Sequence, residues 1–104
     1  MKNLFDIKAL PRDGEEIETV FHYNNIEIKR ILSSDQLHQA TFCQSEAEWV
    51  MLLEGEAKIF MNGRISVLNK GEYLFIPPMC EHTIVDVKEG TVWLAIHIYE
   101  EGRR

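Results

Sequence analysis

Apolar and polar residues alternate along much of the chain with the two-residue period of β-strands. In residues 26–32 the isoleucines alternate with charged residues, which predicts a strand with one buried face. Residues 49–53 are all apolar and predict a short strand buried on both faces. Further strands are predicted at 17–23, 73–76, 82–87 and 92–99.

The clearest local prediction is a β-hairpin. Residues 56–61 and 64–68 have strand character and flank the pair Asn62-Gly63. This pair suits a type I′ turn, because both central residues of that turn need a positive φ. A second turn is predicted at Asn24-Asn25, since Asn tolerates left-handed backbone angles.

Eight or nine strands are predicted in all, with turn signals about every ten residues and no convincing amphipathic helix. This pattern is typical of an all-β sandwich or barrel. The chain has 104 residues, which is enough for one domain and too few for a second module. We therefore expect a single all-β domain over residues 1–104.

Charge and composition narrow the classes of function. The net charge is −6, so the chain lacks the basic surface that nucleic acid requires, and we expect no nucleic-acid partner. No apolar run approaches the ~20 residues of a membrane span, and the charged N-terminus is unlike a signal peptide. We therefore expect a cytoplasmic protein with no membrane partner, in which Cys43 and Cys80 are free thiols.

Two stretches carry a more specific pattern. In the first, Glu48 and Gly55 have the spacing E-x6-G. In the second, Gly71, Pro77 and His82 have the spacing G-x5-P-x4-H. These stretches resemble the two cupin motifs, which are written G-x5-H-x-H-x3-E-x6-G and G-x5-P-x-G-x2-H-x3-N.

The resemblance covers about residues 30–99. It implies a cupin barrel, also described as a double-stranded β-helix or jelly roll. Residues 1–29 are then expected to add N-terminal strands that pack on the barrel or on a partner. Small cupins commonly pair, so the resemblance also implies a homodimer that holds a small-molecule ligand.

The chain departs from the family at the positions that usually bind metal. Phe42 and Gln44 stand where the first motif has its two histidines, and Phe42 cannot bind a metal. The resemblance therefore carries over Glu48 and His82 as metal ligands, with Gln44 as a weaker amide donor. Three further departures from the motifs are Gln36, Met79 and Asp86.

His97 is a candidate replacement ligand. It has the parity of Trp93 and Ala95, so it faces the interior if they do. The chain is also similar to small cupins with the pattern Q-x3-E-W-V and W-L-A-x-H, whose histidine matches His97. A set of Gln44, Glu48, His82 and His97 would suit one divalent ion of iron, manganese, nickel or zinc, with positions open to substrate. The alternative is that the histidines are ordinary hydrogen-bonded residues and that Glu48 is exposed.

Two functions from different classes remain open. One is a metal-dependent enzyme that acts on a small polar molecule by isomerisation, oxygenation or decarboxylation. The other is a metal-free binding or sensing module whose pocket is lined by Phe42, Gln44, Glu48 and His82. The residues name no substrate, because one fold hosts many reactions.

Several remaining residues are expected to be structural. Cys43 has the opposite parity to Gln44 and should point out of the pocket. The pair Glu15-Glu16 is expected to be solvated charge. The aromatic residues expected in the core are Trp49, Phe60, Phe75 and Trp93.

Overall fold

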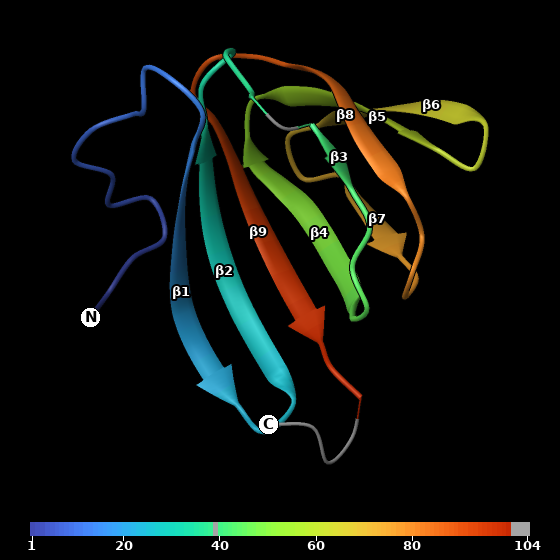
Figure 1. The fold of residues 1–104 in the computed structure, drawn as a ribbon. Coiled ribbons are helices and arrows are strands. Elements are labelled where there is room, and N and C mark those ends of the chain that lie inside the picture. Colours follow the sequence, from blue (N-terminus) through green and yellow to red (C-terminus); the bar gives the residue numbers. More distant parts are fainter. Residues whose placement is uncertain (39, 101–104) are drawn as a thin grey trace.

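The structure of the protein is a computed structural model that describes residues 1–38 and 40–100. The described part is all-β, as the sequence predicts, and has nine strands (Figure 1). The strands are β1 (Glu15–Tyr23), β2 (Ile26–Ser33), β3 (Thr41–Phe42), β4 (Ala47–Glu54), β5 (Glu56–Met61), β6 (Arg64–Asn69), β7 (Tyr73–Ile76), β8 (His82–Val87) and β9 (Thr91–Ile98).

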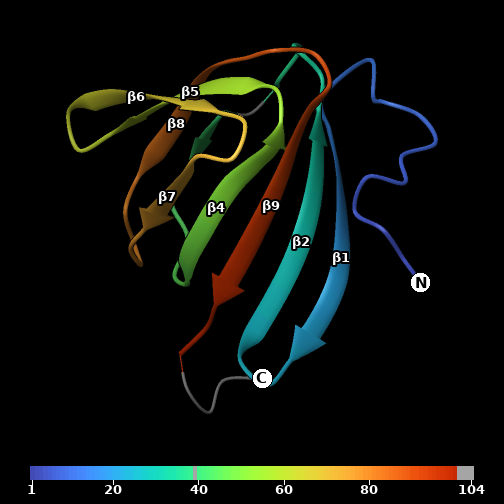
Figure 2. The ribbon, with the colours of Figure 1, turned by 180° about the vertical axis from the view of Figure 1, so that it is seen from behind.

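These strands form two antiparallel sheets (Figures 1 and 2). The first sheet has the order β1-β2-β9-β4-β7, and the second has the order β3-β8-β5-β6. Strands far apart in sequence are neighbours: β2 pairs with β9 along its whole length. Because successive side chains of a strand point to opposite faces, each sheet has an inner face toward the other sheet and an outer face. This is the expected jelly roll.

The core lies between the two inner faces. It includes Val50 and Leu52 of β4, Ala95 of β9 and Ile59 of β5, each at most 2% exposed. Along β4 these buried positions alternate with half-buried ones. The prediction that residues 49–53 are buried on both faces is therefore wrong, because only one face of β4 looks toward the second sheet.

The predicted hairpin is confirmed. β5 and β6 pair up to Met61 and Arg64, which leaves Asn62 and Gly63 as the turn. Their φ angles are 53° and 75°, the positive values that a type I′ turn requires. Asn24, in the turn between β1 and β2, also has a positive φ of 51°.

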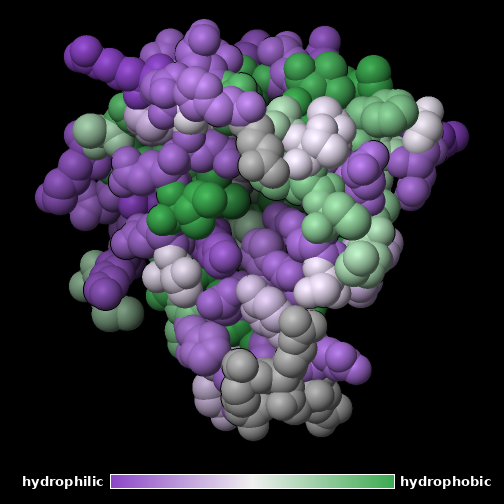
Figure 3. Space-filling model, in the orientation of Figure 1, coloured by the Kyte–Doolittle hydropathy of each residue, from purple (hydrophilic) through white to green (hydrophobic). Residues whose placement is uncertain are grey.

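The expectation of four aromatic core residues is correct only for Trp93, which is 3% exposed. Phe60 and Phe75 are 44% and 50% exposed, because each lies on the outer face of its sheet. There Phe75 pairs with the half-buried Trp49, and Phe60 pairs with Ile65. Figure 3 shows apolar side chains gathered over the region of β5, β6 and β8.

β1 forms one edge of the first sheet, and its side chains change face halfway along the strand. Thr19 and Phe21 pair with consecutive residues of β2, so Val20 is an extra residue in a β-bulge. Before the bulge the odd-numbered side chains face inward, as Glu15 does. After it they face outward, and Phe21 and Tyr23 are 54% and 64% exposed.

Residues 1–14 form no strand and run beside β1 (Figure 1). Arg30 of β2 anchors this segment, since its guanidinium donates to the carbonyls of Leu4 at 2.9 Å and Asp6 at 3.1 Å. The same guanidinium forms an ion pair of 3.0 Å with Glu18. Over residues 1–38 and 40–100, the structure has no helix long and apolar enough to cross a membrane.

The backbone gives a physical reason for two positions of the motifs. Gly55, the last residue of the first motif, has a φ of 93°, and a Cβ at this position would lie 2.7 Å from the Thr91 Cα. Met79 stands where the second motif has glycine, and its φ of 59° is also left-handed. The Met79 N–H donates to the Gln44 carbonyl at 2.7 Å, so this bend is tied to the pocket.

Candidate functional site

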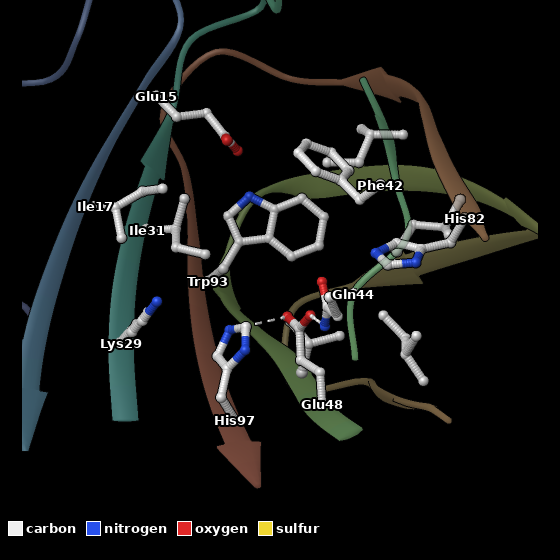
Figure 4. Close-up of a pocket in the computed structure, with 14 residues that line it drawn as sticks. Glu15, Ile17, Lys29, Ile31, Phe42, Gln44, Glu48, His82, Trp93 and His97 are labelled. Atoms are coloured by element: carbon white, nitrogen blue, oxygen red, sulfur yellow. Dashed lines mark hydrogen bonds and ion pairs between the residues drawn. The ribbon is translucent and has the colours of Figure 1, made fainter. Parts of the chain in front are cut away.

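A pocket of about 150 Å³ lies between the inner faces of the two sheets (Figure 4). Both sheets contribute to its wall, which combines aliphatic and aromatic side chains with a few polar groups. The lining residues are Glu15, Ile17, Lys29, Ile31, Phe42, Gln44, Glu48, Val50, Ile59, Ile76, His82, Ile84, Trp93 and His97.

All five residues that the sequence proposed for the site, Phe42, Gln44, Glu48, His82 and His97, line this one pocket. They come from β3, the loop after it, β4, β8 and β9, so the fold gathers them from distant parts of the chain. The two cysteines lie outside the pocket wall. Both are free thiols, and Cys43 is exposed, as its parity predicts.

Glu48 is the most buried carboxylate of the pocket, with 8% of its surface exposed. The Gln44 side-chain amide donates to its Oε1 at 2.7 Å. The His97 Nε2 lies 3.9 Å from its Oε2, within reach of an ion pair when the imidazole is protonated. These two neighbours compensate part of the cost of burying a carboxylate.

His97 is held from its other side by Glu46. The His97 Nδ1 lies 2.8 Å from the Glu46 Oε2, and a carboxylate accepts, so Nδ1 carries a proton. This contact directs Nε2 toward Glu48 and the pocket. Glu46 was not among the predicted site residues, although its even number gives it the parity of Gln44 and Glu48.

His82 faces the pocket from β8, beside Phe42. Its Nδ1 lies 3.0 Å from the carbonyl oxygen of Cys80, and a carbonyl only accepts, so Nδ1 donates and Nε2 is free to accept. Phe42 pairs with His82 across β3 and β8, and their rings stack with centroids 5.8 Å apart. Phe42 therefore covers the imidazole at a position that a histidine occupies in the family motif.

Glu15 belongs to the pocket, and the prediction that it is solvated charge is wrong. β1 carries it to the inner face of the first sheet, where Ser33 donates to its Oε2 at 3.2 Å. Burial raises the pKa of Glu15 above its usual 4.5; the Ser33 hydrogen bond lowers it, and the charge of Glu48 raises it further. The Ser33 hydroxyl is itself fixed, because Trp93 Nε1 donates to it at 2.8 Å.

The donor atoms of the pocket differ from those that a metal ion needs. Across residues 1–38 and 40–100, no group of three or more His, Cys, Asp or Glu side chains is arranged to hold a metal ion. Phe42 offers no donor atom, and Gln44 can offer only its single amide oxygen, a weak ligand, while its NH2 donates to Glu48. The side chains as arranged therefore do not fit a metal in the manner of the family, and the predicted metal stays a prediction.

Solved structures resemble this chain over most of its length. A proposed mannose-6-phosphate isomerase from Ralstonia eutropha JMP134 has a TM-score of 0.85 and 28% identity, and the match covers 96% of this chain and 98% of that one. A cupin superfamily protein from Desulfitobacterium hafniense has a TM-score of 0.75 and 18% identity, covering 90% and 84% of the two chains. An RmlC-like cupin from Shewanella frigidimarina has a TM-score of 0.74 and 17% identity, covering 86% and 79%.

No family model and no curated protein matches the chain. The two facing sheets and the pocket between them define a jelly-roll barrel with an accessible interior. The solved structures show the fold: the protein has the jelly-roll fold of small cupins.

Proposed function

We propose that the protein binds a small organic molecule in the pocket between its sheets and that this binding requires no metal. The observation that carries the proposal is Glu48, a carboxylate 8% exposed on the pocket wall and held by Gln44 and His97. Such a group is costly to bury, so its place on the wall of a pocket indicates a role in recognition.

The size of the pocket sets the size of the ligand. A cavity of about 150 Å³ accepts a molecule about as large as benzene, and a substituent can extend toward the open end. Apolar groups such as Ile31, Val50 and Ile59 surround the ring of such a ligand. Glu48 and its two neighbours supply the polar contacts that fix its orientation.

The test is to close the pocket with one substitution and compare it with a matched one outside. Ile31 and Ile28 lie on the same strand, with Ile31 lining the pocket and Ile28 on the outer face. We expect at least one of three probes, benzylamine, benzyl alcohol or benzoate, to shift amide NMR signals of pocket residues. Ile31→Trp should abolish these shifts and Ile28→Trp should keep them; shifts that survive Ile31→Trp would place binding elsewhere.

A metal-dependent enzyme is the second candidate function. It is favoured by Glu48 and His82, which keep the ligand positions of the family and share one pocket, with the His82 Nε2 free to accept. A bound iron, manganese, nickel or zinc ion would act there as a Lewis acid on a polar substrate. Gln44 and His97 would then complete the set of ligands that the sequence predicts.

Metal content measured by elemental analysis separates the two candidates. The metal-free proposal predicts well below one ion per chain after incubation with Fe²⁺, Mn²⁺, Ni²⁺ or Zn²⁺ and removal of the excess. Phe42→His restores a donor beside His82 and should raise zinc or nickel affinity at least tenfold. One tightly bound ion per wild-type chain, lost in His82→Ala and His97→Ala alike, would favour the enzyme.

A further inference from the structure

The first sheet carries two carboxylates on the pocket wall, and we propose that the ligand of the pocket is a small organic cation. This inference rests on the proposed function. Glu15 of β1 and Glu48 of β4 lie on either side of the Trp93 indole (Figure 4). Among the residues that the structure describes, Glu15 has a hydrogen bond from Ser33 but no ion pair, and Glu48 has only the His97 imidazole, 3.9 Å away, so a positively charged ligand would supply a closer counterion.

A chain of hydrogen bonds fixes Glu15 beside the indole. Trp93 Nε1 donates to the Ser33 hydroxyl at 2.8 Å, and that hydroxyl donates to the Glu15 carboxylate at 3.2 Å. Ser33 is fully buried, so this arrangement is sheltered from water. The indole N–H is thereby used, and Trp93 presents its ring rather than a donor to the ligand. An aromatic ring attracts a cation over its face.

Lys29 and His97, two basic residues of the wall, each contact a carboxylate outside it, and His97 also lies 3.9 Å from Glu48. Lys29 forms an ion pair with Glu27 at 3.9 Å, and His97 lies 2.8 Å from Glu46. Neither Glu27 nor Glu46 lines the pocket, whereas Glu15 and Glu48 do. The wall therefore has an excess of negative charge, which disfavours a carboxylate or a sugar phosphate as ligand.

Two further features agree with a cation. The net charge of the whole chain is −6, which draws cations toward it and repels anions. Phe42 adds a second aromatic ring to the wall, so a small ammonium can meet aromatic carbon as well as carboxylate. The volume of about 150 Å³ limits the ligand to about ten heavy atoms. The chemical class is therefore a primary to quaternary ammonium on a small ring or a short chain.

The test is calorimetry on the full chain at pH 7.5 with three probes of similar shape. Benzylamine is cationic at this pH, benzyl alcohol is neutral and benzoate is anionic. We expect benzylamine to bind at least tenfold more tightly than benzyl alcohol and benzoate to bind most weakly. We also expect added salt to lower the affinity for benzylamine and to leave the affinity for benzyl alcohol unchanged.

Substitution of each carboxylate checks that the preference arises in the pocket. Glu15→Gln and Glu48→Gln should each lower the affinity for benzylamine about tenfold and leave benzyl alcohol within twofold. Glu16→Gln, on the exposed neighbour of Glu15, should change neither affinity. Glu15→Gln remains decisive if Glu48→Gln disturbs Gln44 and His97, because the side-chain hydrogen bond of Glu15 is with Ser33.

The outcomes separate this inference from the proposed function. If benzyl alcohol or benzoate binds in the pocket as tightly as benzylamine, the inference of a cationic ligand is wrong. The proposal that the pocket binds a small molecule would still stand. Benzylamine binding that survives both Gln variants also overturns the inference of a cationic ligand. If none of the three probes binds the wild-type chain, the proposed function fails and the inference fails with it.

Discussion

Met79 occupies a backbone conformation that favours glycine. Its φ is 59°, and a left-handed conformation costs an L-residue with a Cβ about 1–2 kcal/mol. Its side chain is 67% exposed and adds little packing to offset that cost. Because its N–H donates to the Gln44 carbonyl, the strained bend lies directly beside the pocket.

Met79→Gly should therefore stabilise the protein. Glycine removes the cost of a Cβ at this φ, but it also increases the conformational entropy of the unfolded chain. The net increase in the free energy of unfolding is about 0.5–1 kcal/mol. Thermal unfolding should show a rise of about 4 °C in Tm. Met79→Ala keeps a Cβ and serves as the control. An equal rise with alanine would mean that exposure of the methionine, rather than φ, is the cause.

Glu15 links stability to pH. Its folded pKa is raised, chiefly by burial, so above the usual 4.5 the folded state binds more protons than the unfolded state. Stability attributable to this group therefore falls as the pH rises through the folded pKa. Glu15→Gln should raise Tm at pH 7 and have little effect at pH 4, where the carboxyl is protonated in both states. Glu16→Gln is the control; a pH-independent gain would contradict the linkage.

The sequence predicted the lining of the pocket better than its contacts. Motif spacing predicted that Phe42, Gln44, Glu48 and His82 share one site, and the repeated parity of β9 added His97. Glu15 was missed because nothing near it in the sequence indicates that Ser33 and Glu48 will face it. Such a contact depends on the register between distant strands, which the local pattern does not contain.

At the scale of elements, the approach of Gly55 to β9 decides how closely the two sheets join. Gly55 connects β4 of the first sheet to β5 of the second. Thr91, the first residue of β9, is fully buried against it and donates its hydroxyl to the Lys88 carbonyl at 2.7 Å. No side chain fits between them, which explains why this turn needs a glycine.

Gly55→Ala should destabilise the fold by about 3 kcal/mol, through overpacking against Thr91 together with the strained φ. Gly63→Ala is a matched control, since Gly63 also has a positive φ, of 75°, but open space around it. It should cost about 1 kcal/mol. Chemical denaturation of both variants gives the comparison; equal losses would show that close packing at Gly55 contributes nothing.

Elements were predicted more reliably than their buried faces. Three strands have the predicted bounds, 56–61, 73–76 and 82–87, because turn residues and prolines mark their ends. Alternation shows that a strand has two faces, but it does not say which face meets the other sheet. Phe60 and Phe75 were placed in the core for that reason, although both lie on outer faces.

At the scale of the whole molecule, the outer face of the first sheet carries exposed apolar side chains. Five of its residues form what we call the outer apolar face: Phe21, Tyr23, Tyr73, Phe75 and Ile98, which are 37–66% exposed. Five strands about 4.8 Å apart and about 20 Å long present about 500 Å² in projection. Residues near Leu4 and Asp6, held by Arg30, occupy part of this area, so a dimer here would have an interface below the ~800 Å² per partner of standard size.

We propose that a second copy of the chain covers this face, in line with the homodimer that the resemblance implies. None of its five residues is charged, and Glu18 on the same side of the sheet is already paired with Arg30, so two chains of net charge −6 can meet there. Light scattering should give twice the chain mass of 12.1 kDa. The variant Phe21→Lys/Phe75→Lys should halve that value.

The control for the dimer is the apolar patch on the outer face of the second sheet. Phe60 and Ile65 there are also exposed, at 44% and 58%. Phe60→Lys/Ile65→Lys should leave the dimer intact. If this control pair dissociates the dimer and the first pair does not, the interface lies on the second sheet and the proposal is wrong. A monomeric wild-type chain would also contradict the proposed dimer.

The bulge at Val20 restricts how β1 can change in length during evolution. Val20 is the one residue of β1 without a partner of its own in β2, so a lineage can lose it and keep every other pair of the hairpin. Loss of Ile17 instead would turn Glu15 from the pocket to the outer face. Only the second deletion should abolish amine binding, so natural single-residue deletions in this strand are expected at Val20.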